Sequence, residues 1–322
     1  MPSQRLQPPF DVEHELNLEM NGEKAVSHLP GYPHIPLEDS HRIWSFLHSE
    51  FCSDDVDHLA DKLWWMSKQD SASISPIHRQ RVKQRAIVVT EDPKLHLVWI
   101  RDRVFIKPLP CYILSHAFWQ LFLSCNILEN ESHHHIRRAA LGYIRTYQYL
   151  VRYESDFRIA QEADLQLIPS DVTWDQFCHF RDDLASISDG DVSTRYCYGE
   201  IRLTRLNFYA PLLLRKSYFQ RVDYQYEAYF ARFYGPILFG LGIVSVILSG
   251  LQVAVAVEQR AALAAFALVF SVAIIAVVGA LLFWLASLLI YKVAKEWIFA
   301  LQDRRRLLVV EKRKADQSSP FD

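Results

Sequence analysis

The 322-residue sequence predicts an α+β fold: a mostly helical cytosolic domain with a β-hairpin, followed by a C-terminal transmembrane helical hairpin. Residues 235–257 and 261–291 contain no charged side chain, and about 20 apolar residues are enough for one helix to cross a bilayer. Between residues 41 and 233, apolar residues recur with the period of helices and, over a short stretch, of strands. The uncharged runs predict the membrane hairpin, and the periodic segments predict the domain before it.

The chain divides into four parts by composition. Residues 1–40 hold six of the fourteen prolines and carry seven acidic against two basic residues, which is typical of a disordered tail. We therefore expect a disordered acidic tail at 1–40, a cytosolic mixed domain ending in an aromatic interfacial helix at 41–233, a two-helix transmembrane hairpin at 234–291 and a basic cytosolic tail at 292–322.

Local signals predict the elements of the mixed domain. Ser53 followed by Asp54 and Asp55 suits a helix start, because a hydroxyl cap and acids complement the helix dipole. Thr173 with Gln176 resembles a capping box that opens a helix through Leu184. Further helices are expected within 37–68, 114–127 and 136–151. The strand-like runs within 85–107, separated by Arg101-Asp102, predict the β-hairpin, and 186–191 predicts a surface turn.

Composition excludes several classes of protein. The net charge of -2 and pI of about 6.7 argue against a nucleic-acid partner, which would favour a basic excess. The five cysteines are odd in number and none has C-x-x-C spacing, which indicates reduced thiols facing a cytosol and no zinc ribbon. The N-terminal stretch has no apolar core, so we expect no cleaved signal peptide. No cofactor and no metal site is expected.

Basic residues predict the orientation of the membrane hairpin, because they remain on the cytosolic side. The turn between the two runs carries Arg260 alone, so both chain ends should be cytosolic; which membrane is crossed stays open. The basic residues flanking the two runs are Arg215, Lys216, Arg221 and Arg232 before the first, and Lys292, Lys295, Arg304, Arg305, Arg306, Lys312, Arg313 and Lys314 after the second.

The expected partners are the lipid bilayer and, through small-residue helix faces, a protein partner or a second copy of the chain. Small residues let helices approach closely in lipid. They lie at helical spacing in the two runs: Gly242, Ser245, Ser249 and Gly250 in one, and Ala273, Ala276 and Ala280 in the other. The aromatic stretch 217–234, directly before the first run, suits the headgroup zone, and a buried core helix is the alternative.

No catalytic motif is present, and two clusters invite a chemical interpretation. His133, His134 and His135 point about 100° apart if helical, so they cannot easily share one ion. Glu154, Asp156, Glu162 and Asp164 could serve general acid–base chemistry, and arginine pairs or a solvated face are the structural alternative. We therefore name no catalytic, cofactor or metal residue and lean toward a protein that is not an enzyme.

Three stretches together resemble an uncharacterised family of fungal two-span integral membrane proteins: ESDFRIAQEADLQLIP with TWDQF, then RYCYGEIRLTRLNF, then the aromatic approach to the hairpin. The resemblance covers about 109–291 and implies a membrane protein of unknown activity, so it carries over no catalytic role. It implies signature positions, or a structural network, at Glu154, Asp156, Glu162, Tyr198, Gly199, Glu200, Arg202, Arg205 and Asn207.

The layout of a cytosolic domain, two C-terminal spans and a basic tail is also similar to CorA-type magnesium channels. Their Gly-Met-Asn motif is absent here, where the nearest glycine stands in Ser249-Gly250-Leu251-Gln252. We expect a two-span protein with a cytosolic partner-binding or regulatory domain. The alternatives are an oligomeric divalent-cation channel or transporter and a membrane-anchored enzyme using the acids of 154–164.

One contact pattern is also expected within the cytosolic domain. Glu200, Arg202 and Arg205 should brace the domain through an arginine–carboxylate network that includes the acids of the ESDF stretch.

Overall fold

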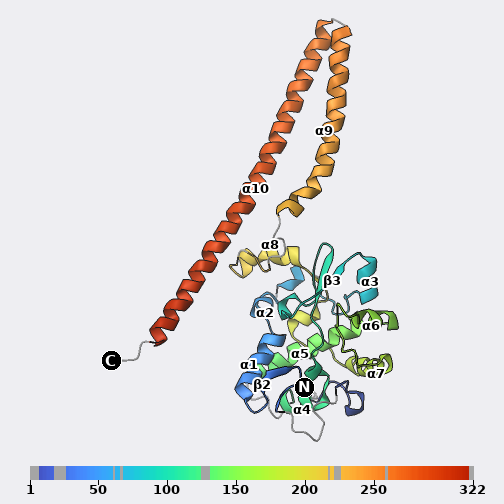
Figure 1. The fold of residues 1–322 in the computed structure, drawn as a ribbon, viewed down its shortest axis with the longest axis vertical. Coiled ribbons are helices and arrows are strands. Elements are labelled where there is room, and N and C mark those ends of the chain that lie inside the picture. The colour runs from blue at the N-terminus through green and yellow to red at the C-terminus, as the bar shows by residue number, and fades with distance from the viewer. Residues whose placement is uncertain are drawn as a thin grey trace. The chain divides into compact units, whose positions relative to one another are not determined.

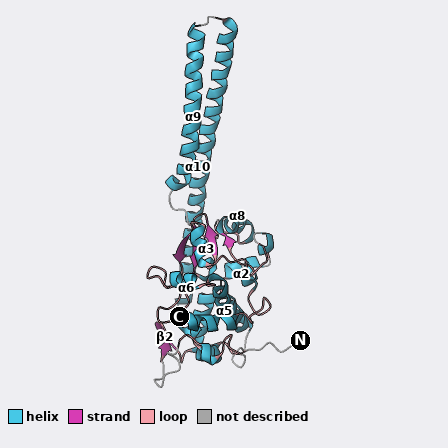
Figure 2. Ribbon diagram, turned by 90° about the vertical axis from the view of Figure 1, so that its right-hand side faces the viewer, coloured by secondary structure: helices cyan, strands magenta, loops and turns pink. Residues whose placement is uncertain are grey.

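The computed structural model describes residues 7–17, 27–60, 62–65, 68–124, 131–216, 218–220, 226–257 and 260–318. The chain forms two compact units, 1–220 and 221–322. Most of the structure is helical, with small β-sheets in the first unit and a pair of long apolar helices in the second, which confirms the predicted α+β class (Figures 1 and 2).

The helices of the first unit are short, apart from one. They are α1 (Ser40–Phe51), α2 (Asp54–Ala60), α3 (Ile77–Val82), α4 (His116–Phe122), α5 (Glu131–Leu150), α6 (Glu154–Ala160), α7 (Trp174–Leu184) and α8 (Leu203–Leu213). The strands are β1 (His28–Leu29), β2 (Tyr32–Pro36), β3 (Ala86–Val89), β4 (Val98–Ile100), β5 (Arg103–Ile106) and β6 (Ile201–Arg202). Short 3₁₀ turns, among them η1 (Val12–His14) and η7 (Thr194–Cys197), join them.

Helix α5 is the centre of the first unit. Its 20 residues are buried along most of their length, because α1, α7 and η7 all pack against it. The apolar side chains of the helix predicted at 136–151, from Ile136 to Val151, lie in the core, and Arg137 and Arg145 are buried with them. Gly142 permits one of these contacts, since the Tyr196 side chain of η7 lies directly over its Cα.

The predicted β-hairpin is confirmed: β4 and β5 pair antiparallel around Arg101-Asp102. Arg101 adopts a φ of 50°, the left-handed conformation that such a tight turn requires. The sheet also contains β3, which lies within the strand-like runs predicted at 85–107, and β6, a strand that the sequence did not reveal. Its order is β3-β5-β4-β6, with β3 parallel to β5 and β6 parallel to β4. The two residues of β6 place the RYCYGEIRLTRLN stretch at the edge of this sheet.

The capping box that opens α7 is also confirmed. The backbone N–H of Gln176 donates to Thr173, and the Gln176 amide oxygen accepts from the Thr173 backbone N–H at 2.9 Å. The helix then ends at Leu184, as predicted. Ser188 and Asp191 close the expected surface turn, since the Ser188 hydroxyl donates to the Asp191 carboxylate at 2.6 Å.

The N-terminal part differs from the expected disordered tail. Phe10 is 3% exposed and packs on Phe180 with ring centroids 4.9 Å apart, and residues 28–36 form the β1–β2 hairpin over α1. Of residues 1–40, the described stretches 7–17 and 27–40 therefore belong to the folded unit. The physical reason is that three apolar side chains of this acidic stretch, Phe10, Leu29 and Ile35, are buried in the core.

The second unit consists of α9 (Tyr226–Val257) and α10 (Ala261–Ser318), which contact each other. Residues Tyr234–Val257 and Ala264–Leu288 have mean hydropathies of 2.2 and 2.9, so the chain has two helices long and apolar enough to cross a membrane. Helix α10 continues without a break through the basic residues that follow the apolar stretch. The side chains of 221–233, which carry most of the predicted aromatic approach, lie outside the described residues.

Replacing Gly142 with alanine should destabilise the first unit. A Cβ there would lie closer than 3.0 Å to the Tyr196 side chain, so α5 and η7 would have to move apart. Overpacking of this kind costs about 1–3 kcal/mol. Gly190→Ala is the matched control, because its nearest neighbour would be Ser188 Oγ at 3.6 Å. Thermal unfolding of the detergent-solubilised chain measures both variants, and equal midpoints would contradict this packing.

Candidate functional site

The Asp156 carboxylate is fully buried at the start of α6. Asp156 Oδ2 accepts the backbone N–H groups of Arg152 at 3.2 Å and Tyr153 at 3.1 Å. Asp156 Oδ1 accepts the backbone N–H of His78 at 2.7 Å and lies 2.8 Å from the His78 ring Nδ1. A buried carboxylate needs such donors, and the N-terminal end of a helix supplies two of them. This acid is held by the fold, and the arrangement leaves it closed to solvent.

Glu200 is the second buried acid, at 9% side-chain exposure, and it follows Gly199 in the RYCYGE stretch. Its Oε1 accepts the Ser75 backbone N–H at 2.7 Å and the Gln80 side-chain amide at 2.6 Å. Its Oε2 accepts from the Arg85 guanidinium at 2.8 Å. Arg85, itself 11% exposed, also lies 4.0 Å above the Trp99 ring of β4. The carboxylate therefore ties β6 to the segment 75–85.

Helix α3 joins these two acids. It presents His78 to Asp156 and Gln80 to Glu200, and Arg81 pairs with Glu162, the third signature acid. Two stretches far apart in the sequence, ESDFRIAQE and RYCYGE, thus converge on one six-residue helix. Sequence reasoning missed α3. Its one signal was Pro76, because proline is favoured at the beginning of a helix.

The backbone of Tyr198 and Gly199 is fixed by Arg195. This buried guanidinium donates to the carbonyls of Tyr198 at 3.0 Å, Gly199 at 3.1 Å and His96 at 2.9 Å. Burial lowers the pKa of Arg195 to about 10. Gly199 is required because a Cβ would overlap the Ser73 carbonyl, to which the Glu200 N–H donates at 3.1 Å. The glycine lets two backbones meet and so brings Glu200 to α3.

The remaining signature residues lie outside this network. Arg202 is exposed and its guanidinium lies 5.2 Å from the centre of the Trp99 ring. Arg205 is on the exposed side of α8. Asn207 binds the chain that leaves the first unit: its Oδ1 accepts the N–H of Phe219 at 2.9 Å and of Gln220 at 3.0 Å, and its Nδ2 donates to the Gln220 carbonyl at 2.9 Å.

An arginine–carboxylate network is therefore present, with partners other than those expected. Arg85 pairs with Glu200, and Arg81 pairs with Glu162. Glu154 pairs with Arg158 one turn along α6, at 2.6 Å. The ESDF acids take their partners from Arg158, His78 and backbone N–H groups, and not from Arg202 or Arg205 as predicted. Helix α3 supplies the donors that connect Asp156 to Glu200.

The sequence did not predict that basic side chains are buried inside the first unit. Lys107 is fully buried, with Nζ 3.0 Å from both Glu50 Oε2 and Glu91 Oε2. Its backbone N–H donates to the ring of His96, whose pKa burial lowers well below the usual 6.5, so that this histidine is neutral. The position of Lys107 at the end of a predicted strand did not indicate that its side chain is buried.

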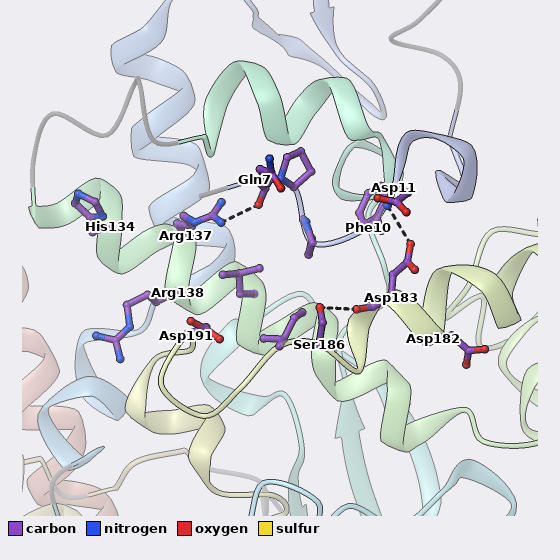
Figure 3. Close-up of a pocket in the computed structure, with 14 residues that line it drawn as sticks. Gln7, Phe10, Asp11, His134, Arg137, Arg138, Asp182, Asp183, Ser186 and Asp191 are labelled. Carbon is purple, nitrogen blue, oxygen red and sulfur yellow. Dashed lines mark hydrogen bonds between the residues drawn. The ribbon is translucent and has the colours of Figure 1, made fainter. Parts of the chain in front are cut away.

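A surface cavity of about 550 Å³ lies between residues 7–11, α5 and the end of α7 (Figure 3). Its polar groups mainly hold the N-terminal segment: Arg137 donates to the Gln7 carbonyl at 3.0 Å, and Asp183 accepts the Asp11 N–H at 2.9 Å. His14 Nδ1 lies 2.7 Å from the same Asp183 carboxylate. Asp11, His14 and Asp183 are close enough to share a cation, and the hydrogen bonds among them already account for the cluster.

The three consecutive histidines do not converge. The His133 ring stacks on Trp44 with centroids 3.7 Å apart, and His134 lines the cavity of Figure 3. His135 Nε2 lies 3.5 Å from Asp57. The separate neighbours agree with the helical geometry expected for adjacent residues.

Residues 43–280 match the model of a family of unknown function (DUF6601), which is 238 of the 322 residues. The chain belongs to this family. No curated protein and no solved structure matches it. The family match includes α3, both signature stretches, α9 and the apolar part of α10 as far as residue 280, so the network described above lies within the family's extent.

Glu200→Gln should destabilise the first unit strongly. The change removes the charge that compensates the nearly buried Arg85, and loss of one partner of a buried pair costs about 3 kcal/mol or more. Glu154→Gln is the matched control, because its exposed pair with Arg158 contributes less than about 0.5 kcal/mol. Denaturant unfolding of the full chain in detergent compares them, and similar losses for both variants would refute the structural role of Glu200.

The N-terminal segment should loosen as the pH rises. The hydrogen bond to Asp183, with help from the charges of Asp183, Asp11 and Glu13, raises the pKa of His14 above its usual 6.5 against the effect of burial. The stabilisation is therefore complete below pH 6.5 and is lost as the pH rises through the folded-state pKa. Hydrogen exchange of residues 7–17, corrected for intrinsic rates, should show less protection at pH 8 than at pH 6. His14→Gln should abolish that difference, and an unchanged pH dependence in this variant would exclude His14 as its origin.

Proposed function

We propose that the chain is a multi-pass membrane protein whose C-terminal helices anchor a cytosolic partner-binding or regulatory domain. The observation that carries the proposal is the pair of apolar windows, Tyr234–Val257 and Ala264–Leu288, neither of which is buried by protein. A core helix of a soluble protein would be covered, and a signal sequence would precede its folded domain instead of following a unit of 220 residues. An exposed apolar surface of this size marks a membrane or protein interaction site, and windows of 24 and 25 residues have the length of bilayer-crossing helices.

A binding role is supported by how the first unit uses its ionisable groups. Glu154, Asp156 and Glu162 each have a partner in the fold, Asp164 is exposed, and none of the four lines the cavity of Figure 3. The three paired carboxylates stabilise the domain, and the enzyme alternative based on these four acids has no observation in its favour. The channel alternative has none either, in the family match or in the described part of α9 and α10. The fungal origin that the resemblance implies stays a prediction.

The orientation follows from the basic residues outside the apolar windows. The short connection between α9 and α10 has Arg260 alone, whereas the extension of α10 from Lys292 to Lys314 has eight basic residues. Cytosolic loops retain basic residues, so both chain ends belong on the cytosolic side. The first unit then lies in a compartment that keeps its cysteines reduced.

A second copy of the chain is one partner that the helices could take. A Cβ added at Gly242, Gly250 or Gly279 would meet no atom within 4 Å, so these small-residue positions are open within one chain. Small residues are favoured where membrane helices pack closely. We propose that this face packs against another membrane helix, and light scattering in detergent reports the number of copies.

Glycosylation mapping tests the membrane topology. An Asn-Ser-Thr acceptor in a flexible insert at Glu258 should be glycosylated in microsomes, because this turn would face the lumen. The native Asn130-Glu131-Ser132 acceptor of the first unit should remain unmodified and is the internal control. Modification at Asn130 without modification at the turn would reverse the orientation, and modification at neither site would argue against two spans.

A further inference from the structure

Helix α8 has an apolar outer face that the described residues of the first unit leave exposed. Leu203, Leu206 and Ala210 are buried against the domain, whereas Phe208 and Leu212 are 75% and 74% exposed. The two exposed side chains stand four residues apart, so they lie side by side on one helix face. A large aromatic and a leucine exposed together are typical of a surface that contacts something else.

Two exposed arginines flank these side chains. Arg205 precedes Phe208 by three residues on the same helix face, whereas Arg215 lies beyond the end of α8 and has a φ of 53°. In chain order this stripe of exposed residues is basic, aromatic, aliphatic and basic. Arginine binds phosphate with paired donors, and aromatic and leucine side chains enter the boundary between headgroups and acyl chains. The stripe therefore matches the two layers of a phospholipid surface.

The length of the connecting chain limits how far α8 can lie from the apolar window of α9. Asn207, in the middle of α8, makes three hydrogen bonds with Phe219 and Gln220. Only residues 221–225 separate Gln220 from the first residue of α9, and six residue steps reach at most about 22 Å. The apolar window begins at Tyr234, eight residues and about 12 Å farther along the helix. Whatever surface α9 enters is therefore within reach of α8.

We propose that α8 lies in the headgroup layer of the membrane that α9 crosses, with Phe208 and Leu212 inserted and Arg205 and Arg215 bound to anionic lipid phosphates. The inference rests on the proposed membrane anchoring. It differs from the aromatic approach segment predicted from the sequence, because α8 is part of the folded unit. Its contact with lipid would orient the whole domain on the bilayer instead of leaving it to turn freely on a tether.

Photocrosslinking of the full chain in lipid vesicles tests this contact. A benzoyl-phenylalanine replaces Phe208 in one variant, Val82 in a second and Phe239 in a third. Val82 is a matched control, because it is 77% exposed on α3, and Phe239 lies within the first apolar window at 72% exposure. In vesicles of phosphatidylcholine and phosphatidylserine, mass spectrometry should detect phospholipid adducts at 208 and 239 and none at 82.

The outcomes separate the two proposals. Adducts at 239 without adducts at 208 would overturn the α8 contact alone, and absence of adducts at 239 would overturn the membrane anchoring on which it rests. Adducts to protein at 208 would assign the face to a protein partner and so contradict the lipid assignment. Removing phosphatidylserine should lower the yield several-fold at 208 only, and an unchanged yield there would exclude the anionic headgroups.

Discussion

A buried carboxylate is stable only when the fold supplies donors for it, and this requirement organises the first unit. Asp156 and Glu200 come from segments 44 residues apart, and each accepts hydrogen bonds from residues 75–85. Helix α3 is too short to be stable by itself, since an isolated helix needs about 12 residues or more. Its hydrogen bonds to the carboxylates of Asp156 and Glu200 hold it in place. The edge of the sheet, the start of α6 and the cation–π contact of Arg85 with Trp99 all depend on this one element.

The same requirement occupies several charged side chains of the domain in its interior. Arg195 donates to carbonyls, Lys107 pairs with carboxylates, and Asp156 accepts from backbone N–H groups. The described surface of the first unit includes the exposed face of α8 and the cavity beside the N-terminal segment (Figure 3).

Local sequence patterns predicted the elements whose formation depends mainly on residues close together in the chain. The uncharged runs became α9 and α10, Thr173 and Gln176 capped α7, and Arg101-Asp102 turned the hairpin. Features that depend on distant pairing were not predictable. The two residues of β6 form a strand because they pair with β4. Phe10 is buried because its ring packs on Phe180. The signature residues showed the same limit, because their spacing could not reveal that a third segment stands between them.

The length of α10 places the first and the last basic residues of the tail at very different distances from the apolar window. The helix runs without interruption to Ser318, and at 1.5 Å per residue its position 292 lies about 6 Å beyond the apolar window, whereas position 314 lies about 39 Å beyond it. Salt at cytosolic strength screens charges over about 8 Å. A straight helix along the membrane normal would let its first basic residues feel the lipid charge and carry the last ones out of range. The last basic residues would then be available to bind acidic surfaces of soluble proteins, and the length of the helix would fix their distance from the bilayer.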